Sequence, residues 1–389
     1  MEHMSTKSSR GFTLMELLVS LALGVLVLGA AVNVFSRGLN ATFVVSQRAE
    51  MQQDLRAASN MLLKDISLAG AGMPPGQGVA LPATAAKPIF GCDQVGSCIP
   101  GGGIAYPCST NIGPCIPTLY GIIPSWQLGI TPPGSVTPTD IITVVYSDSV
   151  FALNCYIVTF PAGGGVNPVT FTAPVPTPPT CSLPPGLVNP QAVDDPVVGL
   201  TAGDLVLFQN TLAAGTGQAI AEVSNAAGGG PYTVNFLNGD PLNINQSGAP
   251  SGDLVQIIAG ANTTATRIFV ISYYLRLQPD PSGVGPGTPV LMRQVNGHTA
   301  VPVAENVVNL GFTYDTYDAF GNLLNAQGNA GYPGTSLNLI RKINLSHLTI
   351  RGQQSGARSA LMTTNGYQSF DFQTSISARN LSYQNRYSF

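Results

Sequence analysis

The chain has 389 residues, which is enough for about two or three average domains or for one domain with large insertions. Charged residues make up only 9 %, the formal net charge is −3, and there are 44 glycines and 31 prolines. This charge balance does not support a nucleic-acid-binding protein, which would carry a basic surface. With 44 % hydrophobic residues the chain is also too apolar for an intrinsically disordered protein. The composition indicates strands, turns and irregular loops with a largely neutral surface.

A long apolar segment near the start of the chain contains one acidic side chain. From Phe12 to Phe35 the only ionisable residue is Glu16. Because a helix rises about 1.5 Å per residue, this segment is long enough to cross a hydrocarbon core roughly 30 Å thick. An acidic residue inside such a span costs on the order of 2.5–3.5 kcal/mol. Its presence therefore indicates a functional role for Glu16.

The residues around Glu16 resemble the class III signal of type IV prepilins, the subunits of type IV pili and of type II secretion pseudopili. The family pattern is a basic leader ending in glycine, then Phe-Thr-Leu-x-Glu and a long apolar run. Here it reads Lys7, Arg10-Gly11 and Phe12-Thr13-Leu14-Met15-Glu16. The resemblance implies that a prepilin peptidase cleaves between Gly11 and Phe12 and that Phe12 becomes an N-methylated N-terminus. It also implies that Glu16 faces the terminal amine of a neighbouring subunit, where opposite charges attract strongly in a low dielectric.

Two other kinds of N-terminal segment would explain part of this pattern. A secretory signal peptide has an apolar region of about 7–15 residues before its cleavage site. This segment is longer, although Gly29-Ala30-Ala31 offers a possible site. An uncleaved signal anchor accounts for the length and for the positive leader, but it gives Gly11 and Glu16 no role. We therefore expect a prepilin signal.

The helical pattern continues beyond the apolar segment. Apolar and small residues from Val44 to Ala69 recur at steps of three and four, and polar residues such as Asp65 fill the remaining surface. The glycine- and proline-rich run from Gly70 to Pro75 predicts a helix end near residue 68. We therefore predict a cleaved leader at 1–11, a helix at 12–69 with 12–35 as its transmembrane or filament-core part, and a head at 70–389.

All six cysteines lie beyond the apolar segment, at Cys92, Cys98, Cys108, Cys115, Cys155 and Cys181. An even number of cysteines in an exported chain indicates disulfides. Several pairings are open, and the simplest ones close short loops: Cys92–Cys98, Cys108–Cys115 and Cys155–Cys181. A zinc site is the alternative, but no two cysteines have the two-residue spacing typical of zinc ligands.

The rest of the chain has the pattern of a β-rich head. Residues 73–138 are rich in Cys, Pro and Gly and are predicted to be a loop region, as are residues 161–196. Residues 202–206 and 251–255 are predicted to be turns that lead into strands, and residues 301–308 a short helical turn. Alternating and β-branched segments predict strands at 140–146, 156–160, 219–224, 232–237, 266–277, 290–295, 310–315, 343–352 and 370–378.

The order of these segments resembles the PilW-type minor pilins, which are related to the J-type minor pseudopilin of type II secretion. In that family a Val-x-Glu-Asn-Val segment commonly precedes a strand, and the last strand is often followed by Arg-Asn. This chain has Val303-Ala304-Glu305-Asn306-Val307 and Arg379-Asn380. The pattern and the resemblance together predict an α+β fold, with a long N-terminal helix and a mostly antiparallel, β-rich head with long Pro/Gly-rich loops.

The sequence predicts no enzymatic site. It lacks the Gly-x-Ser-x-Gly, P-loop and His-Glu-x-x-His motifs, and a histidine-based site outside the leader would need His298 or His347. His347 lies in a strand pattern, where a surface histidine is the simpler interpretation. Asp315 and Asp318 resemble part of a calcium loop, but the spacing and the closing glutamate are missing. A hairpin turn at Phe320-Gly321-Asn322 is the better interpretation, and we expect no metal and no cofactor.

We therefore expect a non-enzymatic structural subunit, a PilW-like minor pilin. It would be a single-pass protein of the inner membrane before assembly and would then reach the periplasm or an extracellular pilus, at its tip. The expected partners are the prepilin peptidase, other major and minor pilins, the inner membrane and the pilus assembly machinery, with no nucleic acid. The alternatives are a J-type minor pseudopilin and a pilus-borne adhesin or ligand-binding head.

Overall fold

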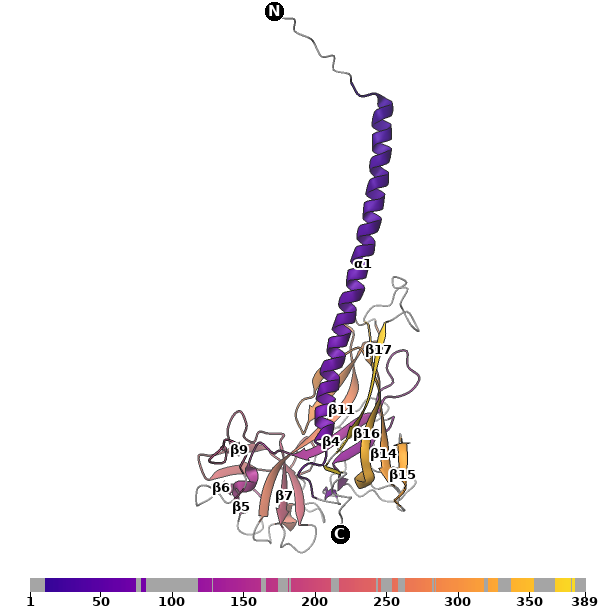
Figure 1. The fold of residues 1–389 in the computed structure, drawn as a ribbon. Helices are drawn as coiled ribbons and strands as arrows, with labels where there is room; N and C mark the ends of the chain where they lie inside the picture. Colours follow the sequence, from indigo (N-terminus) through magenta and orange to yellow (C-terminus); the bar gives the residue numbers. More distant parts are fainter. Residues whose placement is uncertain are drawn as a thin grey trace, which may run out of the picture. The chain divides into compact units, whose positions relative to one another are not determined.

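The computed structural model describes residues 11–74, 78–81, 118–127, 129–161, 166–173, 181, 183–210, 217–242, 244–245, 254–257, 263–281, 283, 285–317, 321–327, 337–352, 368–378 and 380–381. In these residues a long N-terminal helix precedes a set of antiparallel sheets (Figure 1), so the predicted α+β class is confirmed. The chain forms two compact units, residues 1–52 with 352–368 and residues 53–351 with 369–389.

Helix α1 runs without interruption from Leu14 to Ser67, two residues inside each end of the predicted range 12–69. Its last turns belong to the second unit, where Ala58, Leu62 and Ile66 are completely buried. After the helix, Gly70 adopts a left-handed conformation with φ of 75°, as expected of glycine at a helix C-terminus.

The described strands form four antiparallel sheets, and all of the strands belong to the second unit. A two-stranded sheet pairs β1 (Val79–Ala80) with β2 (Thr118–Leu119). The largest sheet comprises β3 (Ile122–Ser125), β4 (Ile141–Ser147), β7 (Leu205–Asn210), β8 (Gln218–Glu222), β11 (Thr263–Gln278), β12 (Thr288–Val295) and β13 (Val301–Glu305). A third sheet has the order β5 (Ile157–Thr159), β6 (Val169–Thr172), β10 (Tyr232–Asn235) and β9 (Asn225–Ala227). The fourth has the order β15 (Leu323–Gln327), β14 (Val307–Tyr317), β16 (Ile340–Arg351) and β17 (Ser369–Ser377).

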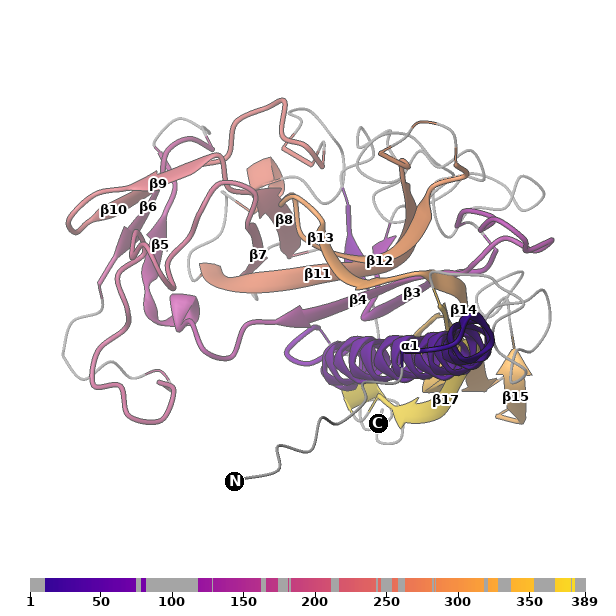
Figure 2. The same ribbon diagram turned by 90° about the horizontal axis from the view of Figure 1, so that it is seen from above.

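Strand β11 is the organising element of the largest sheet (Figure 2). Its first part pairs with β7 and its second half with β12 along one side, and its middle pairs with β4 on the other side. Although β4 and β11 are neighbours in the sheet, residues 148–262 separate them in the sequence. This intervening segment contains β5 to β10, and its own core includes Phe171, Phe208 and Phe236.

Three 3₁₀ turns complete the described elements: η1 (Leu153–Cys155), η2 (Leu254–Gln256) and η3 (Leu337–Leu339). The prediction that residues 251–255 lead into a strand is wrong, because η2 occupies part of this segment. Leu254 and Ile257 are buried in the core of the intervening segment. The single turn η2 buries the side chains of Leu254 and Ile257, so this segment needs no neighbouring strand to bury them.

The helical turn predicted at residues 301–308 is also wrong. Residues 301–305 form strand β13, and the chain then passes through Asn306 into β14. Asn306 has φ of 56°, a left-handed conformation that asparagine tolerates better than most residues. This single residue redirects the chain from the largest sheet to the fourth sheet, which a periodicity argument cannot detect.

Both predicted loop regions contain strands. The segment 73–138 includes β1, β2 and β3, and every residue of β3 is buried. The segment 161–196 includes β6, which lies between β5 and β10. These strands are only two to four residues long, and Pro124 interrupts the apolar pattern of β3, so their sequence signal is weak. Strands β9 and β15 were also not predicted.

The backbone that follows α1 is joined directly to β4, and Gly72 permits this junction. The N–H of Gly70 donates to the carbonyl of Val145 over 2.7 Å, and the N–H of Ser147 donates to that of Ala71 over 2.7 Å. Gly72 has φ of 66°, and a Cβ added there would overlap the Ser147 hydroxyl.

We expect Gly72→Ala to destabilise the second unit by at least about 2 kcal/mol, because left-handed strain of about 1–2 kcal/mol adds to an overlap of about 1–3 kcal/mol. Denaturant unfolding of the detergent-solubilised chain, followed by the fluorescence of Trp126, measures this loss; the chain has one tryptophan. Gly186→Ala is the matched control, since Gly186 has φ of 89° and nothing near its missing Cβ. Equal losses at both sites would contradict the overlap.

Candidate functional site

The N-terminus of α1 is closed by a reciprocal pair of hydrogen bonds between Thr13 and Glu16. One carboxylate oxygen of Glu16, Oε2, accepts from both the backbone N–H and the hydroxyl of Thr13, each over 3.0 Å. The N–H of Glu16 in turn donates to the Thr13 hydroxyl over 3.3 Å. The first intrahelical bond follows, from the N–H of Leu17 to the carbonyl of Thr13. This is a capping box, which satisfies backbone donors that a helix start leaves without partners.

The capping box gives Glu16 a local role that the sequence analysis missed. The signal was present, because Thr-x-x-Glu before an apolar run is its known signature. Within the chain, the carboxylate is therefore held at the start of the helix, beside the first residues of the apolar segment. Neutral donors satisfy some of its hydrogen-bonding capacity, but no cation is paired with it among the described residues.

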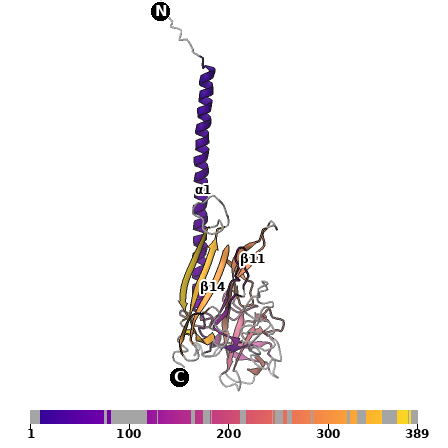
Figure 3. The ribbon, with the colours of Figure 1, turned by 90° about the vertical axis from the view of Figure 1, so that its right-hand side faces the viewer.

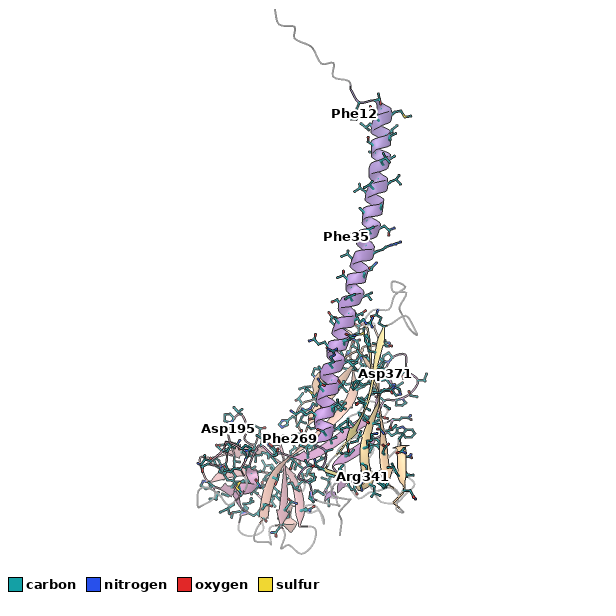
Figure 4. All side chains as sticks on the ribbon, viewed as in Figure 1. Phe12, Phe35, Asp195, Phe269, Arg341 and Asp371 are labelled. Atoms are coloured by element: carbon teal, nitrogen blue, oxygen red, sulfur yellow. A yellow bond between two sulfur atoms is a disulfide. The ribbon has the colours of Figure 1, made fainter. Side chains whose placement is uncertain are left out.

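The first part of α1 exposes an apolar surface on all sides. Every residue from Gly11 to Leu39 is exposed, and Figure 4 shows side chains projecting around the helix between Phe12 and Phe35. Such a surface is untenable in water and indicates contact with lipid or with other protein surfaces. Among the described helices, α1 is long and apolar enough to cross a membrane.

Hydroxyl groups of α1 bond to the helix itself, both in the apolar part and just beyond it. Ser20 donates its hydroxyl to the carbonyl of Glu16 over 2.7 Å, and Thr42 donates to that of Gly38 over 3.0 Å. Such bonds to the preceding turn satisfy a hydroxyl without any external partner. The segment is therefore compatible with a hydrocarbon environment, where an unsatisfied polar group is costly.

The other predicted signal residues lie just before the helix or outside the described residues. Gly11 and Phe12 precede the first helical residue, and Phe12 is exposed. Lys7 and Arg10 lie outside the described residues. The structure therefore brings Thr13 and Glu16 together at a helix start that directly follows the Gly11–Phe12 bond.

One of the three predicted disulfides falls on described residues and is confirmed. Cys155 and Cys181 are bonded, with their Cα atoms 5.4 Å apart. The bond ties the end of η1 to the segment that follows β6, at the edge of the core of the intervening segment. Cys92, Cys98, Cys108 and Cys115 lie outside the described residues, so their pairings stay predictions.

The two histidines of the head each face an aspartate. Nε2 of His298 lies 2.9 Å from Oδ1 of Asp204, and Nδ1 of His347 lies 3.2 Å from Oδ2 of Asp371. The hydrogen bond to Asp204 raises the pKa of His298 despite partial burial. His347 is about half exposed on the sheet surface, as its strand pattern suggested.

Asp315 forms hydrogen bonds within the fourth sheet, to the other strand of its hairpin and to β16. Its Oδ1 accepts from the N–H of Ala326 over 2.9 Å and from the side chain of Asn344 over 3.0 Å. Strands β14 and β15 pair on either side of the predicted turn, while Asp318 and Phe320 lie outside the described residues. No group of three or more His, Cys, Asp or Glu side chains that could hold a metal ion occurs in the part of the chain that the structure describes.

A buried carboxyl at the end of β8 carries a strongly shifted pKa. Glu222 is 1 % exposed, and its Oε2 accepts from the N–H of Leu242 over 3.1 Å. Burial, with a further contribution from the neighbouring Asp240, raises the pKa of Glu222 to about 8. In the unfolded chain the same group has a pKa of about 4.5. Between these pH values the folded state holds a proton that the unfolded state has lost, so stability falls as pH rises and levels off above about pH 8.

We expect Glu222→Gln to remove this loss, because glutamine reproduces the shape and donor of the protonated carboxyl. The wild-type chain should lose about 1.4 kcal/mol per pH unit from this group within the window, so the variant should be the more stable protein at pH 9. Unfolding at pH 5, 7 and 9 measures the difference, in which the titration of His298 cancels. Glu305→Gln, at an exposed position, is the control and should keep the wild-type pH dependence of stability. If Glu222→Gln also kept it, the assignment would be wrong.

The end of α1 is anchored by a buried ion pair that the sequence analysis placed on the surface. Asp65 is 3 % exposed, and its Oδ2 accepts from Nε of Arg293 over 2.7 Å and from the hydroxyl of Tyr273 over 2.6 Å. The hydroxyl of Tyr146 reaches Oδ1 over 3.3 Å. Burial and the Asp65 carboxylate raise the pKa of Tyr273 well above its usual value. These partners come from β4, β11 and β12, so one carboxylate on the helix contacts three strands.

Residues 6–32 match the family model of the prokaryotic N-terminal methylation motif. The match includes the Gly11–Phe12 bond, Thr13 and Glu16. The motif supports a type IV pilin-like protein. The length and composition of the exposed apolar part of α1 fit a membrane anchor. No curated protein and no solved structure matches the chain.

Proposed function

We propose that this protein is a non-enzymatic structural subunit, a minor pilin that assembles into, primes or caps a type IV pilus. The observation that carries the proposal is the placement of Glu16 at a helix start that directly follows the Gly11–Phe12 bond, within the matched methylation motif. The partners are the prepilin peptidase, other major and minor pilins and the assembly machinery of the inner membrane.

The proposed mechanism uses charge pairing in a medium of low dielectric constant. Cleavage after Gly11 by the prepilin peptidase creates a positive amine at Phe12, which is then methylated. The capping box holds the Glu16 carboxylate close to this end of the helix. In a bilayer each charge is costly alone, whereas the amine of one subunit and the carboxylate of its neighbour stabilise each other. Pairing between subunits therefore sets the axial position of the incoming chain.

The size of the head favours a role in few copies. Residues 53–351 and 369–389 form a head with three sheets of four or more described strands, which is more than a repeating shaft subunit needs for packing. The segment 148–262 enlarges the head between two adjacent strands of its largest sheet. We infer that the head provides contacts at the tip or in the initiation complex.

The test is quantitative mass spectrometry of sheared, purified filaments, combined with deletion of the gene. A minor pilin is expected to be present at a small fraction of the major subunit, and its loss should reduce filament number. The J-type minor pseudopilin is the alternative, because the same motif occurs in both systems. Normal filaments together with a loss of protein secretion would favour that alternative and overturn the pilus assignment.

A further inference from the structure

The edges of the described sheets differ in how they are protected against pairing with another strand. An edge strand presents unpaired N–H and C=O groups, and proteins commonly protect it by making it short or by adding proline, bulges, lysine or covering side chains. In this chain β13 contains Pro302 and a register shift against β12, and β3 contains Pro124 and is buried. Strand β8 is covered by Asn245, whose side chain bonds both the N–H and the carbonyl of Glu222.

The remaining edges are short or irregular, with one exception. Strand β15 has five residues, a register shift against β14 and a left-handed Ala326. Strands β5 and β9 have three residues each. Strand β17 forms one edge of the fourth sheet and has nine residues, without proline, lysine or a positive φ angle. Its pairing with β16 has a register shift between Leu345 and Leu348, which places the extra residue in β16 and leaves β17 regular.

The single charge of β17 does not protect this edge. Asp371, labelled in Figure 4, bonds to neighbouring side chains through both of its carboxylate oxygens. The hydroxyl of Thr349 donates to Oδ1 over 2.8 Å, and Nδ1 of His347 and Nε2 of Gln373 lie 3.2 and 2.8 Å from Oδ2. Thr349 and His347 belong to β16, so the carboxylate is held over the sheet surface instead of extending beyond the edge.

The side chains of β17 alternate in exposure along its length. Odd-numbered residues from Ser369 to Ser377 are exposed, whereas Phe370, Phe372 and Thr374 are half-buried and Ile376 is buried. Figure 3 shows the strands of this sheet beside one another. A further strand would find main-chain partners at alternate residues of β17, and its own apolar side chains would bury more of Phe370 and Phe372.

We propose that β17 is a docking edge to which a different pilin-type subunit adds an extended strand by β-augmentation. Main-chain hydrogen bonds supply the attraction in this mode, and alternating side chains supply the specificity. The partner strand alternates apolar and polar residues and has a neutral or basic residue opposite Asp371, because like charges across strands are destabilising. The choice of a different subunit rests on the proposed function, since a subunit present in few copies meets other subunits in the filament.

The test places a photo-crosslinking amino acid at Ser375, an exposed position of β17, in the full chain expressed in its own cells. The expected product is a covalent adduct with another pilin-type subunit, identified by mass spectrometry of its peptides. The same amino acid at Asn325, an exposed position of the protected edge β15, is the control and should not give that adduct. Ser375→Lys should lower incorporation into filaments at least about tenfold, because a lysine protects the edge. Asn325→Lys should leave incorporation unchanged. Neither substitution should change the unfolding midpoint.

Three results would overturn the inference. They are an adduct with a second copy of this chain, an adduct only within the chain, and no adduct from a chain that is processed and present in filaments. A chain that keeps its leader and stays outside filaments would overturn the proposed function as well. A processed and assembled chain without the adduct overturns the docking edge alone, so the two failures are distinguishable.

Discussion

Glu16→Gln should leave the start of α1 and cleavage after Gly11 intact but should reduce incorporation into filaments at least about tenfold. Glutamine keeps a side-chain oxygen that can accept from the N–H and hydroxyl of Thr13, so the capping box survives. It removes the negative charge, and the amine of Phe12 in a neighbouring subunit is then left without a partner. Breaking a buried ion pair in this way costs about 3–5 kcal/mol, and about 1.4 kcal/mol already corresponds to a factor of ten. Quantitative mass spectrometry of membrane and filament fractions measures the effect.

Thr13→Ala is the matched control for this variant. It removes the hydroxyl that donates to the Glu16 carboxylate and accepts from the Glu16 N–H. It keeps the Glu16 carboxylate. Loss of a helix cap costs about 0.5–2 kcal/mol, so incorporation should fall less than in Glu16→Gln. If Glu16→Gln assembled like the wild-type chain while Thr13→Ala did not, Glu16 would act only as a helix cap, and the pairing mechanism would be wrong.

Arg293→Met should destabilise the head by about 3–5 kcal/mol, because it leaves the buried Asp65 carboxylate without a cation. The hydroxyls of Tyr273 and Tyr146 remain as donors, but they do not supply a positive charge. Denaturant unfolding followed by Trp126 fluorescence measures the loss. The effect should also detach the end of α1 from β12, which a rise in amide hydrogen exchange at residues 58–67 would show.

Two further variants define what the ion pair contributes. Asp65→Asn combined with Arg293→Met removes both charges, keeps an oxygen for the Tyr273 hydroxyl, and should recover a large part of the lost stability. Lys342→Ala breaks a more exposed pair, with Nζ of Lys342 3.8 Å from Oδ2 of Asp315, and should cost less than about 1 kcal/mol. If the double variant were as unstable as Arg293→Met, side-chain packing and not charge pairing would hold the end of α1 against the strands.

The sequence was sufficient where the structure depends on local pattern. The helix from Leu14 to Ser67 and long strands such as β11 and β16 follow from periodicity and from the glycine- and proline-rich run after the helix. The Thr13–Glu16 capping box has an equally local signature and could have been predicted. The short strands β3 and β6 could not be, because too few residues carry their alternation.

Long-range partners account for the remaining misses. Asp65 follows the polar pattern of a helix surface, and its partners Tyr273 and Arg293 lie 208 and 228 positions away in the sequence. Asn306 changes the chain direction through one left-handed residue, which no periodicity reveals. The unusual regularity of the β17 edge likewise becomes visible only when all the described edges are compared.

The central claim is that Phe12 becomes the N-terminus of an assembled pilin-like subunit. Its most direct test is intact mass and N-terminal sequencing of the membrane-extracted protein, from cells with and without the prepilin peptidase. We expect a chain that begins at Phe12 and carries the mass of one added methyl group, only when the peptidase is present. A chain that begins near Ala31, or one that keeps its leader in both strains, would contradict this account.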